Sequence, residues 1–98
     1  MGAAAVPALT GALGSEDVLV RRRAAWILEQ LAERSGGAAT LLPLLFAVRD
    51  DDEEVRYWAA WGLGKLGGKE PDLAQILRAA ITSEGVERVR DRLRAGLR

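Results

Sequence analysis

One short pattern occurs three times along this chain. The copies begin at Val20–Arg21, Val55–Arg56 and Val89–Arg90, at intervals of 35 and 34 residues. The first two copies are closely similar, since residues 20–31 read VRRRAAWILEQL and residues 55–66 read VRYWAAWGLGKL. Self-similarity at this period indicates stacked helical units, each too small to bury its apolar face alone. The repeat therefore constrains the architecture more strongly than any single residue does.

Each copy places its apolar residues on one face of a helix. This predicted core face consists of Val20, Ala24, Ile27, Leu28 and Leu31 in the first copy, Val55, Ala59, Gly62, Leu63 and Leu66 in the second, and Val89, Leu93 and Leu97 in the third. Gly62 on this face predicts a close approach of another helix. Gly64, which falls outside the face, is expected to point to solvent.

A shorter apolar helix is predicted before each copy, over roughly residues 3–13, 39–49 and 71–82. No segment shows the alternation of apolar and polar residues that a half-buried strand requires. We therefore predict an all-α fold of about three antiparallel helix pairs in one domain, residues 1–98. The repeats are expected at approximately 3–36, 38–68 and 70–98.

A pair of hydrogen-bonding residues accompanies every copy. An acceptor stands five residues before each valine, and an arginine stands one residue after it. The acceptors are Ser15, Asp50 and Glu84, and the arginines are Arg21, Arg56 and Arg90. A guanidinium presents its donors as a fork that matches a carboxylate. The recurrence predicts a ladder of polar contacts that ties neighbouring repeats together.

The repeat resembles that of the HEAT-repeat family in its short bacterial form. The shared signature is an apolar helix, an acidic turn and then Val-Arg-x-x-Ala-Ala-x-x-Leu. It occurs with Val20, Arg21, Ala24, Ala25 and Leu28, and again with Val55, Arg56, Ala59, Ala60 and Leu63. The third copy departs, because Leu93 and Arg94 replace the two alanines. The resemblance covers nearly the whole chain and implies an α-solenoid, a right-handed superhelix whose second helices, the B helices, line the concave face.

The composition excludes several kinds of chemistry. The chain has no Cys and no His, so it lacks thiol nucleophiles, disulfides and the commonest general base and metal ligand. We therefore expect no catalytic residue, no metal site and no cofactor. Lys plus Arg and Asp plus Glu are 14 each, and this neutrality argues against a dedicated binder of polyanions. The apolar segment 1–14 lacks a cationic start and is too short to span a bilayer, so we expect a soluble, cytoplasmic protein.

The candidate binding residues lie on the B helices of the first two copies. On a helical wheel, Tyr57 and Trp61 fall opposite the core face and Trp58 falls on its flank. Trp26 is the counterpart of Trp61 in the first copy. Aromatic residues together with arginine are enriched in binding hot spots. The predicted partner-binding residues of the concave face are Arg22, Trp26, Tyr57, Trp58, Trp61 and Lys65. An alternative interpretation assigns the tryptophans to packing between repeats.

These observations favour a non-catalytic scaffold that binds another protein. Two alternatives stay open. The repeats are similar to those of phycobilin lyases, which implies an accessory or lyase-type module acting on a bilin-carrying protein. Some helical-repeat proteins bind nucleic acid through phosphate contacts, although the neutral charge argues against this. The first predicted helix carries no charged residue, which predicts self-association or contact with a preceding domain through that helix. We expect no contact with membranes.

Overall fold

Short and long helices alternate in the computed structural model, which describes residues 2–34, 37–67 and 72–98 and has no strand among them. The first helices of the pairs, called A helices, are α1 (Val6–Ala12), α3 (Leu41–Ala47) and α5 (Leu73–Ser83). The B helices are α2 (Val18–Leu31), α4 (Glu53–Leu66) and α6 (Glu87–Ala95). Two short 3₁₀ helices, η1 (Gly2–Ala5) and η2 (Gly37–Thr40), lead into α1 and α3.

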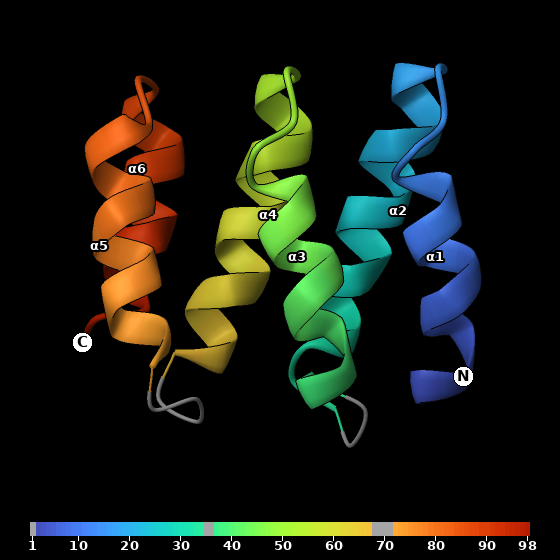
Figure 1. Cartoon of the computed structure of the whole chain (residues 1–98), viewed down its shortest axis with the longest axis horizontal. Helices are drawn as coiled ribbons and strands as arrows, with labels where there is room; N and C mark the ends of the chain where they lie inside the picture. The colour runs from blue at the N-terminus through green and yellow to red at the C-terminus, as the bar shows by residue number, and fades with distance from the viewer. Residues whose placement is uncertain (1, 35–36, 68–71) are drawn as a thin grey trace.

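The three helix pairs stand side by side in one row (Figure 1). Each A helix runs antiparallel to the B helix that follows it, and the two termini lie at opposite ends of the row. The B helices form a continuous layer, because α4 packs against both α2 and α6. Helix α3 contacts both α2 and α4. This arrangement confirms the predicted all-α fold of three antiparallel helix pairs.

An aspartate caps each of the first two B helices. Oδ1 of Asp17 accepts the Leu19 N–H at 2.9 Å, and Oδ2 of Asp52 accepts the Val55 N–H at 3.0 Å. Both aspartates have extended backbone angles, as N-cap residues do. Their charge also lies at the positive end of the helix dipole. Each of these B helices therefore begins at a defined residue, which helps to set its register against its neighbours.

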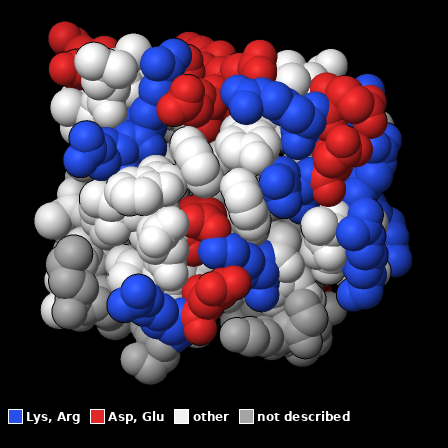
Figure 2. All heavy atoms as spheres, turned by 180° about the vertical axis from the view of Figure 1, so that it is seen from behind, with Lys and Arg blue, Asp and Glu red and all other residues white. Residues whose placement is uncertain are grey.

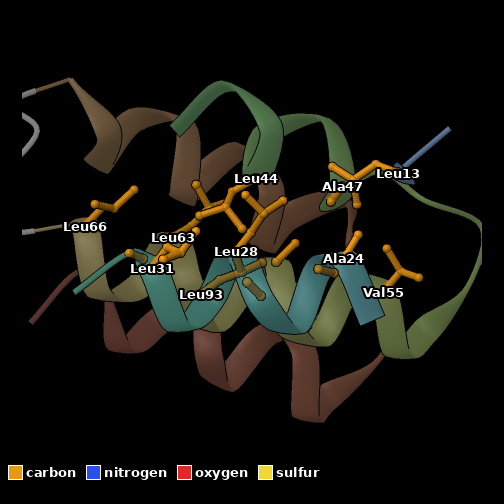
Figure 3. Packing of buried hydrophobic residues seen from close by; sticks show 14 of the residues in the cluster. Leu13, Ala24, Leu28, Leu31, Leu44, Ala47, Val55, Leu63, Leu66 and Leu93 are labelled. Atoms are coloured by element: carbon orange, nitrogen blue, oxygen red, sulfur yellow. The ribbon is translucent and has the colours of Figure 1, made fainter. Parts of the chain in front are cut away.

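Apolar residues from both layers form one core (Figure 3). Leu28, Leu44 and Leu63 have no exposed surface. The B helices contribute small residues to this core, and these are at most 2% exposed: Ala24, Ala25, Ala59 and Ala60. Small side chains let the B helices approach closely, while the leucines fill the space between the B layer and the A helices.

The first valine of the repeat differs from its counterparts. Val55 and Val89 are fully buried, whereas Val20 is 40% exposed. The prediction that Val20 belongs to the core face is therefore wrong. Helix α2 lies against α4, and α4 lies against α6, so Val55 and Val89 each face a preceding repeat. No helix pair of the described residues lies before the first pair in the row, and the same helical position there faces solvent.

Glycines permit a close contact between α4 and α6. A Cβ added to Gly64 would lie 2.9 Å from the backbone oxygen of Arg92, and a Cβ added to Gly96 would lie 2.9 Å from the Gly64 Cα. Gly64 thus faces α6, and the expectation that it points to solvent is wrong. The close approach predicted at Gly62 is present, because a Cβ there would lie 2.8 Å from Cδ1 of Leu44.

Gly64→Ala should lower the free energy of unfolding by up to about 2 kcal/mol. The added methyl group overpacks against the α6 backbone, which costs about 1–3 kcal/mol, and the gain in helix propensity, up to about 1 kcal/mol, offsets only part of that cost. Gly11→Ala is a matched control, since a Cβ there meets nothing within 4 Å; it should keep the propensity gain and stabilise the fold. Chemical denaturation of both variants measures the two effects, and a stabilised Gly64→Ala protein would contradict the α4–α6 contact.

Candidate functional site

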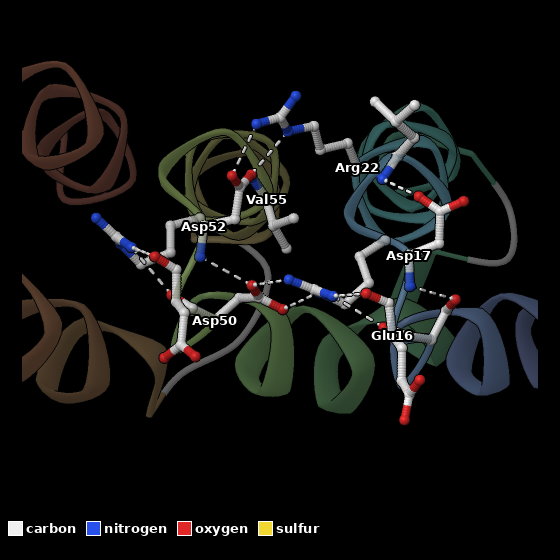
Figure 4. A network of polar contacts seen from close by, with 11 residues as sticks. Glu16, Asp17, Arg22, Asp50, Asp52 and Val55 are labelled. Atoms are coloured by element: carbon white, nitrogen blue, oxygen red, sulfur yellow. Dashed lines mark hydrogen bonds and ion pairs between the residues drawn. The ribbon is translucent and has the colours of Figure 1, made fainter.

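Two arginine forks connect neighbouring repeats near the N-terminal ends of the B helices. Figure 4 shows the polar network around Asp50, which belongs to the first fork. Nε of Arg21 donates to Oδ2 of Asp50 at 3.1 Å, and Nε of Arg56 donates to Oε1 of Glu84 at 3.0 Å. Nη1 of each arginine also donates to two carbonyl oxygens in the turn before its own helix. Each carboxylate accepts the backbone N–H two residues further on. Every fork therefore joins the turns of two consecutive repeats.

The ends of this ladder differ from its middle. Oγ of Ser15 accepts the Asp17 N–H at 3.1 Å but receives no arginine side chain from the described part of the chain. Arg90 donates from Nη1 to the Glu84 carbonyl oxygen at 3.2 Å and from Nη2 to Glu87. Its buried Nε has no acceptor among the described residues. Within the ladder, side-chain pairing between repeats thus involves Arg21 and Arg56, whereas Ser15 and Arg90 bond within their own repeats.

The tryptophans and Tyr57 lie on the B helices. We call the surface formed by α2, α4 and α6 on the side away from the A helices the B-helix face. Uncharged side chains occupy the middle of this face, with acidic and basic side chains clustered around them (Figure 2). The Trp58 and Trp61 rings of α4 stack with centroids 5.6 Å apart. The Tyr57 ring meets them edge-on, at 5.2 Å and 5.7 Å. The three rings form one cluster, and all three are half-buried.

Cationic side chains cover this aromatic cluster. The guanidinium carbon of Arg92 on α6 lies 3.6 Å from the Trp61 ring centroid, and that of Arg88 lies 4.6 Å from the Tyr57 centroid. Nε of Arg92 also donates to the Tyr57 hydroxyl at 3.3 Å. Lys65 lies 5.9 Å from the Trp61 centroid. Since Arg88 and Arg92 belong to the next repeat, the rings of Tyr57 and Trp61 help to pack α4 against α6.

Most other charges of this face are paired across the helices. Arg22 makes two hydrogen bonds to the Asp52 carboxylate, at 2.9 Å and 2.8 Å. The pKa of Asp52 falls to about 2, chiefly because of these bonds; burial acts in the opposite direction, and backbone N–H groups at the helix start lower the pKa further. Lys65 of α4 contacts the buried carboxylate of Glu29 on α2. These pairs fix the side chains that border the aromatic cluster.

Trp26 differs from the other predicted binding residues. It is 40% exposed, the most exposed tryptophan, and makes no ring contact with another aromatic residue of the described chain. The structure therefore brings Tyr57, Trp58, Trp61 and Lys65 together on α4 and leaves Trp26 available on α2. Arg22 lies between the two helices, bound to Asp52.

A cleft that sequence reasoning missed lies on the opposite side of the row, between α3 and α5. Its volume is about 830 Å³, and its apolar lining includes Leu45, Val48 and Ile76. Helix α3 also exposes Leu42 and Phe46, by 75% and 61%. A signal was present, because α3 reads LLPLLFA and carries more large apolar residues than one buried face accommodates. The distance between α3 and α5 that opens the cleft could not be inferred from helical periodicity.

The described residues show neither a membrane span nor a cluster of metal ligands. None of the described helices combines the length and the apolar character that a bilayer crossing needs. Within the same residues, no three His, Cys, Asp or Glu side chains gather as a metal ion would require. In the acidic run 50–54, Asp50 and Asp52 bind arginines, and Asp52 also caps α4.

The fold and its exposed surfaces define a short stack of helical repeats suited to contact with other molecules. A family model described as HEAT repeats matches residues 6–98, and the chain therefore belongs to the HEAT-repeat family. Repeats of this family generally mediate protein–protein interactions and are typically non-catalytic. Comparison with curated proteins found no match, and comparison with solved structures found none either.

The ion pair of Asp52 makes stability depend on pH in a defined direction. Its folded-state pKa of about 2 lies below the ordinary value of 3.8, so its contribution is complete above about pH 5 and is lost as the pH falls to 2. Asp52→Asn keeps a capping acceptor but removes the charge. We expect this variant to be about 1 kcal/mol less stable than the wild type at neutral pH and equally stable near pH 2. Urea unfolding at both pH values measures this, and a pH-independent difference would contradict the Arg22 pairing.

The second fork should contribute measurably to stability. Arg56→Ala leaves the Glu84 carboxylate, in a residue only 8% exposed, without its charged partner. We expect a loss of about 1–3 kcal/mol in the free energy of unfolding. Arg49→Ala is the control, because Arg49 is exposed and has no ion pair with another described residue. If the two variants melt at the same temperature, the fork does not stabilise the stack.

Proposed function

We propose that this protein is a non-catalytic scaffold that binds another protein through its B-helix face, which the family's superhelix would make concave. The observation that carries the proposal is the exposure of Trp26 beside an aromatic cluster on an otherwise closely paired surface. An indole ring buries a large apolar area when a partner covers it. Tryptophan and arginine are also the residue types most enriched where binding energy concentrates.

The rest of the face supports this role because its side chains are already ordered. The pairs Arg22–Asp52 and Lys65–Glu29 hold their side chains between helices. A partner that meets an ordered surface loses less conformational entropy on binding. The B-helix face is therefore a preorganised platform, and Trp26 is the anchor that we expect a partner to cover.

Arg92 indicates the chemistry of the partner. Its guanidinium stacks on Trp61 and donates from Nε to Tyr57, but no carboxylate of the described residues pairs with it. An arginine held flat on a ring presents its remaining donors at its edge, where they match a carboxylate. We expect a partner segment that places an apolar group on Trp26 and an acidic side chain at Arg92.

The two alternative functions have less support. Phosphate contacts require available cations, whereas Arg22, Arg88 and Lys65 each contact a carboxylate. An accessory role toward a bilin-carrying protein would be one form of protein binding, and no feature of the described face selects for a chromophore.

The cleft between α3 and α5 is a second candidate binding surface. Its volume of about 830 Å³ lies within the usual size of ligand sites, about 300–1,000 Å³. Ile76, 41% exposed, would be covered by an apolar partner there.

Peptides selected from a random display library against the wild-type chain can distinguish the two surfaces. We expect Trp26→Ala to weaken binding of the selected peptides at least tenfold, about 1.4 kcal/mol, because the anchor is lost. Its melting temperature should change little, since the ring is partly exposed. Ile76→Glu, which places a charge in the cleft, should bind the peptides as the wild type does.

The reverse pattern, with binding lost in Ile76→Glu and kept in Trp26→Ala, would assign the partner to the cleft. A library that yields no binding peptide at all would argue against recognition of linear protein segments by either surface.

A further inference from the structure

The N-terminal edge of the row, formed by α1 and α2, is an apolar surface that nothing in the described chain covers. A groove of about 330 Å³ runs along it, lined by Leu9, Ala12, Leu19, Val20, Arg23, Ala24 and Ile27. Leu19 is 64% exposed and Val20 is 40% exposed. Helix α1 contributes no charged residue.

The same helical positions are interfaces elsewhere in the row. Val20, Ala24 and Ile27 correspond to Val55, Ala59 and Gly62 of α4, which lie at the seam with the preceding repeat and are buried there. The edge therefore continues an established packing surface, and its residues have the character of an interface rather than of a solvent face.

The opposite edge of the row is not a suitable occupant. Ala60 and Gly64 lie one turn apart on the side of α4 that meets α6. In the third repeat their positions are taken by Arg94, on α6, and by Arg98, beyond the end of that helix. Arg94 is bound to Glu87 at 2.7 Å and to Asp91 at 2.9 Å. This bulky, internally paired edge prevents a second copy from stacking head to tail as α4 stacks on α2.

A preceding repeat with an arginine fork is also a poor fit. In the inner repeats the fork meets a carboxylate, Asp50 or Glu84. At the N-terminal edge the equivalent residue is Ser15, whose hydroxyl carries no charge and therefore offers an arginine no ion pair. The edge is thus apolar enough to pack against another surface. It lacks the carboxylate that receives the arginine of the preceding repeat where repeats stack within the row.

We infer that the N-terminal edge binds the same edge of a second copy of this chain, about a two-fold axis near Val20. In a two-fold contact the same surface of both copies meets. Such a contact does not require the arginine–carboxylate pairs that join consecutive repeats. It would cover both grooves and both Leu19 side chains. Asp17 and Arg23 stand three residues on either side of Val20, and neither has an ion pair within the described residues. The axis sets Arg23 of each copy against Asp17 of the other, so their charges complement one another.

The area of the N-terminal edge determines how strongly we expect the two copies to bind. The molecule measures 28 Å along the helices and 16 Å through its two layers, so the edge offers roughly 450 Å² per copy, well below the ~800 Å² per partner of standard stable interfaces. The dimer is therefore weak and reversible, formed at high protein concentration.

Analytical ultracentrifugation of the wild-type chain across the micromolar to millimolar range tests this. We expect a monomer–dimer equilibrium with no larger species. Leu19→Glu should raise the dissociation constant at least tenfold, because two charges enter the apolar contact, and Arg23→Glu should also raise it, because it opposes Asp17. Leu42→Glu is the matched control, as Leu42 is equally large and 75% exposed on α3; it should leave the equilibrium unchanged.

A wild-type chain that stays monomeric throughout would overturn the inference, as would equal effects of Leu19→Glu and Leu42→Glu. An open-ended series of oligomers would indicate head-to-tail stacking and exclude the two-fold contact. Circular dichroism and melting temperatures separate these outcomes from unfolding, since Leu19 lies in the first turn of α2, where an acidic residue is favourable.

Discussion

The close approach of the B helices determines how the other parts of this molecule are arranged. It depends on residues with little or no side chain, such as Ala60 and Gly64 on α4 and Gly96 after α6. Because the backbones lie so near one another, longer side chains beside these positions cannot pass between the helices. They lie across the seam instead, where Arg92 meets Trp61 and Arg22 meets Asp52. The polar and aromatic contacts of the B-helix face are thus a consequence of small residues beneath them.

This arrangement explains why the face resembles a platform more than a reactive site. Lys65 and Arg88 contact carboxylates of other helices, and Asp52 is used both by Arg22 and by the start of α4. Groups held in this way are ordered before any partner arrives. The proposed binding role uses this order, because a partner that meets an ordered surface loses less conformational entropy on binding.

Periodicity was sufficient to predict the helices, their pairing and most of the core, because one apolar face is enough to define a helix that packs on one side. It failed where a helix packs on more than one side. Gly64 lies outside the main apolar face but contacts a second neighbour, α6. Val20 matches the pattern yet is exposed, because burial at this position depends on a preceding helix pair, and none lies there among the described residues. The cleft between α3 and α5 depends on the distance between two helices, which no local pattern encodes.

The differences between the copies carry information that their similarities do not. At one edge, Ser15 replaces the carboxylate that the inner repeats use to receive an arginine. At the other, Arg94 replaces the alanine that the inner repeats use to receive a helix. Each difference takes away one feature that the inner repeats use to stack on a neighbour. The two differences have distinct effects on their edges. Arg94 makes its edge bulky and polar. Its guanidinium is already paired there with Glu87 and Asp91. Ser15 removes only a charge and leaves the apolar side chains beside it uncovered. The C-terminal edge is consequently closed by its own residues, whereas the N-terminal edge gains stability only when another surface excludes water from it.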